Sequence, residues 1–201
     1  MPSDDLDNPV GTTRAGGWRS TTSARSKVYS RNLPAIDVSA LRIFIVDDNE
    51  FTVTVIKRLL TAMRVSDIFG CSNPEQALGE MKQTKPDVVI IDLEMPGKHG
   101  LELVRDIRRG EAGIPANVAI LVASAYADRE QVRKASNAGS NWVLAKPLSF
   151  RNLYEGLVRV TLDDRPFVRA DGYIGPCRRV HVTSPEQLLA KRRRTDFSES
   201  G

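Results

Sequence analysis

Three aspartates in this 201-residue sequence stand directly after runs of apolar residues, where carboxylates can do chemistry. Asp47 and Asp48 follow one run, and Asp92 follows another. Because like charges repel, such a group is expected to hold a cation unless one member is protonated. Oxygen-only ligands suit magnesium or calcium rather than zinc. Taken singly, each Asp has a simpler role, since an isolated Asp after a strand usually begins a loop or caps a helix.

Two further polar side chains end apolar runs of the same kind. Ser124 ends one run, and Lys146, which is followed by Pro147, ends another. A carboxylate, a cation site, a hydroxyl and an ammonium are together what a doubly negative phosphoryl group needs for charge neutralisation and positioning. Taken singly, Ser124 suits a turn and Lys146 a solvated charge. Together with the three aspartates they predict one site for phosphoryl chemistry.

The elements that must position this site alternate along residues 41–160 between short apolar runs and helical patterns. Continuous apolarity is typical of strands covered on both faces. The predicted strands span residues 41–46, 66–71, 87–91, 118–123 and 141–145. This alternation predicts a doubly wound α/β fold, in which a five-stranded parallel sheet is flanked by five helices. Ligands of such sheets bind outside the carboxyl ends of the strands, where the polar residues stand.

The predicted helices are recognised by apolar residues at three- and four-residue steps and by residues that begin helices. Asn73 followed by Pro74 signals the start of the second helix, and Asp128 and Ser149 are expected to cap the fourth and fifth. The expected buried faces carry Val55, Ile56, Leu59, Leu60 and Met63; Ala77 and Met81; Leu103, Val104 and Ile107; Val132 and Ala135; and Leu153, Leu157 and Val160.

Residues 41–160 resemble a response regulator receiver domain of the CheY type. The resemblance is carried by the acidic pair in IVDDNE, the acceptor in IIDLEMPGKHG, the Ser in LVASAYA, and the Lys and Pro in VLAKPLS. It implies a flavodoxin-like sheet with strand order 2-1-3-4-5. It also implies a response regulator of two-component signal transduction. Asp92 would accept a phosphoryl group from a sensor histidine kinase or a histidine phosphotransfer protein, and would then switch a protein–protein interaction or relay the phosphate.

The resemblance further implies a cofactor and its ligands. Mg²⁺ would be held by Asp48, Asp92 and the backbone carbonyl of Glu94, with Asp47 acting mainly through bound water. The protein would be a phosphoacceptor switch with self-catalysed aspartyl phosphorylation and dephosphorylation, and not an enzyme in the ordinary sense. A metal-dependent phosphohydrolase is the alternative, because similar carboxylates on similar sheets do that chemistry.

The remaining residues of the resemblance concern the phosphoryl group and its consequences. Lys146 would pair with one phosphoryl oxygen, and the Ser124 hydroxyl would bond another. Glu94 and Tyr126 occupy the two variable positions that flank the site. The sequence departs from the family where an aromatic usually precedes the Lys by three residues, because Val143 stands there with Trp142 beside it. Neighbouring strand residues point to opposite faces, so Trp142 is not expected to replace that aromatic.

The segments outside the receiver-like part are short. Residues 1–38 predict a disordered arm, residues 39–161 the receiver domain, and residues 162–201 a partly ordered extension with a short basic helix. No separate output domain is expected. The segment RPFVRADGYIGPCRRV either lies across the receiver surface or docks on a partner, and we favour the first interpretation.

Composition excludes several classes of protein. No apolar run is long enough to cross a membrane, so we expect a cytoplasmic protein without membrane insertion, and the resemblance implies a bacterial one. Cys71 and Cys177 are expected to be ordinary thiols. The formal net charge is +4, and the basic run Lys191 to Arg194 predicts only weak attraction to phosphates, so DNA is not the expected partner. The downstream protein is unknown, and phosphorylation-dependent dimerisation is left open.

Overall fold

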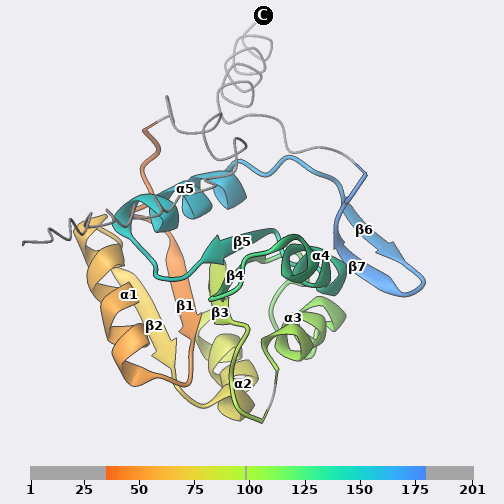
Figure 1. The fold of residues 1–201 in the computed structure, drawn as a ribbon, viewed down its shortest axis with the longest axis horizontal. Helices are drawn as coiled ribbons and strands as arrows, with labels where there is room; N and C mark the ends of the chain where they lie inside the picture. The colour runs from red at the N-terminus through yellow and green to blue at the C-terminus, as the bar shows by residue number, and fades with distance from the viewer. Residues whose placement is uncertain (1–34, 98, 180–201) are drawn as a thin grey trace, which may run out of the picture. The chain divides into compact units, whose positions relative to one another are not determined.

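The computed structural model describes residues 35–97 and 99–179, and five parallel strands alternate with five helices along them (Figure 1). A two-stranded hairpin follows. In chain order the elements are β1 (Arg42–Val46), α1 (Glu50–Ala62), β2 (Asp67–Cys71), α2 (Pro74–Thr84), β3 (Val88–Asp92), α3 (Gly100–Arg109), β4 (Ala119–Ser124), α4 (Arg129–Ala138), β5 (Trp142–Ala145), α5 (Phe150–Thr161), β6 (Phe167–Ala170) and β7 (Tyr173–Pro176). The five predicted strands are confirmed, each within one residue of its predicted bounds.

The sheet has the order β2-β1-β3-β4-β5, and all its strands are parallel, as the resemblance implied. The register aligns the carboxyl ends of the strands. Val46 lies level with Ile91, so the residues that follow β1 emerge beside the end of β3. Asp92 lies level with Ala123, one residue before the end of β4. The backbone pairing alone therefore brings the carboxyl ends of β1, β3, β4 and β5, where the polar residues stand, to one edge of the sheet.

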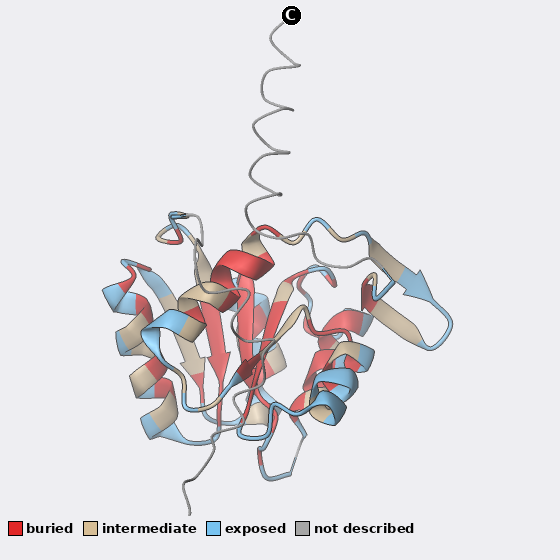
Figure 2. Cartoon of the chain, turned by 45° about the horizontal axis from the view of Figure 1, so that its top comes forward, coloured by how far each residue is buried: buried red, intermediate tan, exposed pale blue. Residues whose placement is uncertain are grey.

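Two layers of helices cover the sheet, and buried residues concentrate in the strands and on the helix faces turned toward them (Figure 2). Side chains alternate along each strand, so Ile91 packs with α2, α3 and α4, whereas Ile90 packs with α1 and α5. Every residue of β3 is buried, which explains why this strand is apolar throughout until Asp92.

The predicted helix starts are confirmed by their hydrogen bonds. The Asn73 side chain accepts from the Glu75 N–H at 3.0 Å, and the Asp128 side chain accepts from the Gln131 N–H at 2.8 Å. Ser149 forms a reciprocal capping box at the start of α5. These bonds satisfy N–H groups that have no partner inside the helix.

Most of the predicted inner faces are buried, with one correction. Val132 of α4 is 41% exposed and does not reach the core. This helix packs on the sheet only through its C-terminal half, where Ala135 and Ala138 are buried. The Val132 side chain instead lines a hollow beside the C-terminal hairpin. Val55 and Leu59 of α1 are half-buried at the edge of its inner face.

The hairpin of β6 and β7 packs on the receiver part of the chain, as we favoured over docking on a partner. Its strand β7 contacts both α3 and α4. The backbones approach so closely that a Cβ on Gly139 would collide with the Ile174 carbonyl. The guanidinium of Arg165 donates to the Asn141 carbonyl at 3.0 Å and pairs with Asp163 at 2.6 Å, which fixes the segment between α5 and the hairpin.

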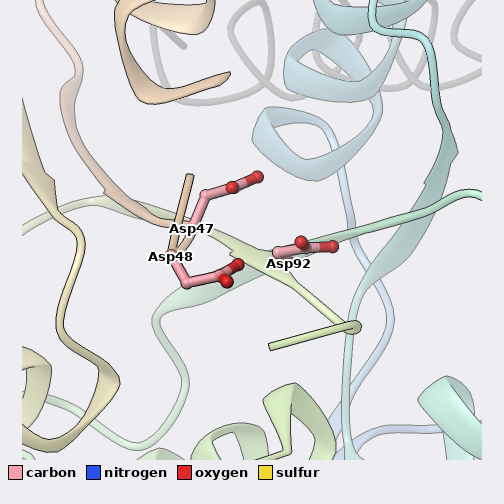
Figure 3. Close-up of side chains that lie close together, drawn as sticks. All are labelled: Asp47, Asp48 and Asp92. Atoms are coloured by element: carbon pink, nitrogen blue, oxygen red, sulfur yellow. The ribbon is translucent and has the colours of Figure 1, made fainter. Parts of the chain in front are cut away.

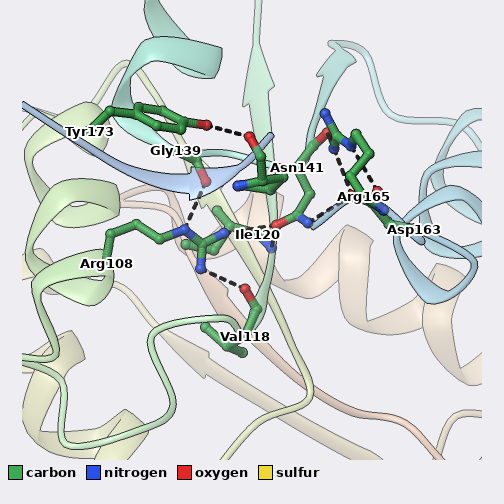
Figure 4. Close-up of polar contacts among 9 residues, drawn as sticks. Arg108, Val118, Ile120, Gly139, Asn141, Asp163, Arg165 and Tyr173 are labelled. Carbon is green, nitrogen blue, oxygen red and sulfur yellow. Dashed lines mark hydrogen bonds and ion pairs between the residues drawn. The ribbon is translucent and has the colours of Figure 1, made fainter. Parts of the chain in front are cut away.

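Arg108, on the last turn of α3, is buried with 1% of its surface exposed (Figure 4). Its guanidinium donates to the carbonyls of Gly139, Ala116 and Val118 at 2.7 to 2.8 Å, and to the Asn141 side chain at 2.8 Å. Burial lowers the pKa of Arg108 to about 10, so the group stays charged at neutral pH. One cation therefore ties together the ends of α3, α4 and the loops before β4 and β5.

Several expectations concern residues outside the described ranges. The arm at residues 1–34 and the basic helix near residues 184–194 stay predictions. Residues 35–38 are described, and here the Ile36 N–H donates to the Tyr154 hydroxyl at 2.9 Å while Val38 is buried. Cys71 and Cys177 are not joined by a disulfide bond. Within the described residues no helix has the length and apolarity that crossing a membrane requires.

Candidate functional site

The three predicted aspartates meet at the carboxyl edge of the sheet. Asp47 and Asp48 come from the loop after β1, and Asp92 ends β3 (Figure 3). One carboxylate oxygen from each lies within 4.8 Å of the others. Asp47 is 2% exposed and Asp92 is 4% exposed, whereas Asp48 is open to solvent. Two of these charges are thus shielded from water and the third stands at the entrance.

Lys146, which follows β5, binds two of these carboxylates. Its Nζ lies 2.8 Å from Asp92 Oδ2 and 3.0 Å from Asp47 Oδ2. Burial by itself lowers the pKa of Lys146, but its bonds to Asp92 and Asp47 together outweigh burial and raise that pKa above its ordinary value. Burial also raises the pKa of Asp47, against the opposing effects of Lys146 and the Asn49 N–H. The ammonium therefore remains charged, and it balances only part of the negative charge.

The donor set fits a divalent cation. Three carboxylates and one ammonium leave an excess of negative charge in a site where two of the acids are buried. Carboxylate oxygens are the ligands that magnesium and calcium prefer. Like charges held this close are costly without a counter-ion. The chemistry of the residues present thus matches the magnesium site that the resemblance implied.

Ser124, at the end of β4, is connected to the same edge through Glu94. The Ser124 hydroxyl donates to Glu94 Oε1 at 3.2 Å, and the Ala125 N–H lies 3.4 Å from Glu94 Oε2. The Glu94 N–H in turn donates to Asp92 Oδ1 at 3.3 Å. The Glu94 carboxylate therefore binds two donors at the end of β4, the Ser124 hydroxyl and the Ala125 N–H. Sequence reasoning assigned a role to the Glu94 carbonyl, and did not find this side-chain contact.

The backbone around Asp92 is held tightly. The Leu93 N–H donates to the Ala123 carbonyl at 3.0 Å, which continues the β3–β4 ladder past Asp92. A Cβ on Gly100, the first residue of α3, would collide with the Asp92 carbonyl oxygen. Glycine is therefore required here by this close approach of the backbone.

Trp142 and Val143 lie on opposite faces of the sheet, as expected. Val143 packs with the cluster under α3 and α4, while Trp142 packs with the cluster under α1 and α5. The guanidinium of Arg159 lies over the Trp142 ring at 4.4 Å from its centre. Trp142 is therefore a packing residue of the α5 side, and it does not take the place of the usual aromatic.

An apolar hollow of about 430 Å³ adjoins the acidic pocket. It lies between α1 and the loop that carries Lys146, and it is lined by Phe51, Ile56, Pro147 and Leu148 among others. The Phe51 side chain is 74% exposed, and Tyr126 beside the site is 70% exposed. The side chains that line this hollow thus form an apolar rim around Phe51.

Comparisons with known proteins agree with this geometry. The model of the response regulator receiver domain family matches residues 43–157. The chain is 29% identical over 120 residues to the chemotaxis protein CheY of Thermotoga maritima, covering 60% of this chain and 97% of that protein. It is 30% identical over 128 residues to the sensory/regulatory protein RpfC of Xanthomonas campestris, covering 64% of this chain but only 18% of RpfC. The structure of CheY4 of Vibrio cholerae superposes with a TM-score of 0.55 at 22% identity, over 60% of this chain and 98% of that one.

Proposed function

Because the chain belongs to the response regulator receiver domain family, we propose that it works in two-component signal transduction as a switch whose phosphoacceptor is Asp92. The observation that carries this proposal is the setting of one carboxylate. Asp92 is buried, lies 2.8 Å from the Lys146 ammonium, and shares an acidic pocket with Asp47 and Asp48. Asp47 shares this burial and the Lys146 partner, at 3.0 Å, so the choice of Asp92 rests on its place in the family's acceptor motif IIDLEMPGKHG.

In the proposed reaction an Asp92 oxygen attacks phosphorus, and the bond between phosphorus and its donor breaks in line with the attack. The products are an acyl phosphate on Asp92 and the freed histidine or carboxylate of the donor. Lys146 stays beside the new group and pairs with one of its oxygens. Asp48, Asp92 and the Glu94 carbonyl would hold Mg²⁺, with Asp47 acting mainly through bound water, and the bound ion would neutralise charge on the transferring group.

Switching follows from the hydrogen bonds of Ser124. Once Asp92 is phosphorylated, its oxygens compete with the Glu94 carboxylate for the Ser124 hydroxyl and the Ala125 N–H. A full reversal of a two-state population needs about 5.5 kcal/mol of differential binding. Hydrogen bonds to charged groups contribute roughly 1.5–3 kcal/mol each. The net gain is the difference between the phosphoryl contacts and the Glu94 bonds that they replace, so the loop after β4 moves when the phosphoryl oxygens bind these donors more strongly.

The proposal is tested by incubating the purified chain with acetyl phosphate and measuring its intact mass. We expect one phosphoryl group per chain in the presence of Mg²⁺, and loss of the reaction when EDTA removes the metal. Labelling that proceeds equally well with EDTA would contradict the metal site. Continuous turnover of a phosphoester, without a stable labelled chain, would favour the phosphohydrolase instead.

Glu94→Ala is expected to speed labelling by acetyl phosphate. The variant frees the Ser124 hydroxyl and the Ala125 N–H, and it removes a negative charge that faces an anionic donor. The initial rate should rise roughly two- to tenfold, which corresponds to about 0.5–1.5 kcal/mol of competing hydrogen bond. Glu94→Gln, which keeps an acceptor without the charge, should fall between the variant and the wild type. A slower Glu94→Ala would mean that this carboxylate assists the reaction.

We further propose that the phosphodonor is a sensor histidine kinase or a phosphotransfer protein of the cytoplasm, and that it docks on the apolar rim around Phe51. An exposed aromatic beside the acceptor suits the hot spot of a protein interface. Phe51→Ala should slow transfer from a phosphorylated donor protein about thirtyfold, since anchor residues contribute on the order of 2 kcal/mol. Labelling by acetyl phosphate, which needs no docking, should not change.

Val132→Ala is the matched control for Phe51→Ala, because it trims an exposed apolar side chain on a helix away from this rim. It should leave both reactions at the wild-type rate. If Phe51→Ala slowed transfer from the protein donor and labelling by acetyl phosphate equally, the substitution would have damaged the acceptor site. The rim would then be rejected as the docking surface.

A further inference from the structure

A second hollow, of about 780 Å³, lies between the outer face of α4 and the C-terminal hairpin. The α4 helix contributes Arg129, Val132 and Arg133 to its wall, and the hairpin with the residues after it contributes Tyr173, Arg178 and Arg179. The hairpin begins at Phe167, beyond the end of the family match at residue 157. This basic groove is therefore built partly from a segment that the family model does not contain.

The groove carries a strong excess of positive charge. Four arginines line it, against the single carboxylate of Asp171. Neither Arg129 nor Arg133 takes part in an ion pair within the described residues. The nearby acid of the same helix, Glu130, is bound instead by Lys134 at 2.9 Å. Unpaired guanidinium groups gathered in a hollow favour an anionic partner, which they can bind with paired N–H donors.

The wall of the groove is ordered and partly apolar. The Arg178 guanidinium lies 4.0 Å from the centre of the Tyr173 ring and donates to the Asn137 side chain. The Tyr173 hydroxyl donates to the Pro176 carbonyl at 2.7 Å. Val132 presents its exposed side chain between the arginines. A partner that fills this groove must therefore offer apolar surface as well as negative charge.

We propose that the basic groove binds an acidic segment of a partner protein, in which Asp or Glu residues stand beside an apolar or aromatic side chain. The carboxylates would pair with Arg129, Arg133 and Arg179, and the apolar side chain would cover Val132. A nucleic acid fits less well, because phosphates alone leave Val132 uncovered and meet the carboxylate of Asp171 inside the groove. Since α4 follows the loop that carries Ser124, such a partner would lie next to the element that the proposed switch moves.

The test measures binding of the full chain to a random copolymer of glutamate and tyrosine, by fluorescence anisotropy at low and at physiological salt. Polyglutamate, duplex DNA and single-stranded RNA are the comparison probes. We expect the copolymer to bind more tightly than polyglutamate or either nucleic acid. The double variant Arg129→Glu with Arg133→Glu should weaken copolymer binding by at least about tenfold, which is 1.4 kcal/mol. Arg129→Gln with Arg133→Gln is the milder variant if the first does not fold.

The matched control places the same charge change elsewhere, as Arg58→Glu on α1 with Lys82→Glu on α2, both exposed. It should bind the copolymer like the wild type. An equal loss of copolymer binding in this control would mean that binding depends only on net charge. It would reject the groove as the binding site. If either nucleic acid bound more tightly than the copolymer and lost this binding in the groove variant, the proposal of an acidic protein partner would be wrong. The groove would then bind nucleic acid. Labelling by acetyl phosphate should be unchanged in every variant, so this test is separate from that of the acceptor site.

Discussion

Asp92→Asn is expected to abolish phosphorylation by acetyl phosphate and by any protein donor, leaving intact mass at its unlabelled value. An amide has no charged oxygen to attack phosphorus, and it also removes one of the three carboxylates of the pocket. The isosteric side chain keeps the volume at the end of β3, where every residue is buried. The expected loss is therefore chemical, and thermal unfolding should show that the fold is retained.

The control for this variant is Asp67→Asn, which neutralises an exposed acid at the start of β2. It should be labelled at the wild-type rate. Asp48→Asn should lose labelling because of weaker metal binding, and raised Mg²⁺ should restore part of it, whereas no concentration of Mg²⁺ should rescue Asp92→Asn. Wild-type labelling of Asp92→Asn would reject Asp92 as the acceptor.

Arg108→Ala is expected to cause the largest loss of stability of any single substitution at a polar residue in the described ranges. It deletes a side chain that is 1% exposed and leaves the carbonyls of Gly139, Ala116 and Val118 without a donor. A buried cavity and unsatisfied acceptors together cost about 3–5 kcal/mol. A domain of this size has about 5–15 kcal/mol in total, so the urea midpoint should fall by about a fifth or more.

Arg109→Ala, one residue further along α3, provides the comparison. Its guanidinium is 59% exposed and makes only surface ion pairs, so its loss should cost less than about 1 kcal/mol. Arg108→Met separates the two parts of the effect, because it fills much of the volume without donating hydrogen bonds. Arg108→Ala with a midpoint equal to that of Arg109→Ala would mean that the buried guanidinium contributes nothing net to folding.

The sheet and the meeting of most candidate site residues were predictable from the sequence because both depend on local signals. Apolar runs place the strands, and parallel strands bring their carboxyl ends to one edge whatever the loops do. Asp47, Asp92 and Lys146 stand directly after such runs, so their meeting follows from the topology. The opposite orientation of Trp142 and Val143 follows in the same way from the two-residue repeat of a strand.

The remaining features depend on contacts between distant residues, which leave no local signal. Arg108 has the position of an ordinary solvated cation on the last turn of a helix, and only the fold surrounds it with carbonyls. Val132 has the spacing of a buried residue, but α4 does not reach the sheet at that turn. The bond between Glu94 and Ser124 joins two loops whose side-chain positions no spacing rule determines.

The hairpin of β6 and β7 limits how far the chain can be truncated from its C-terminal side. Phe167 lies over the Arg108 guanidinium at 5.6 Å, and β7 covers the end of α4 at Gly139. A fragment that stops at the end of α5 would keep every strand of the central sheet, yet water would reach the buried cation and its carbonyl partners. We therefore expect a fragment that stops at the end of α5 to be less stable than one that extends through Pro176.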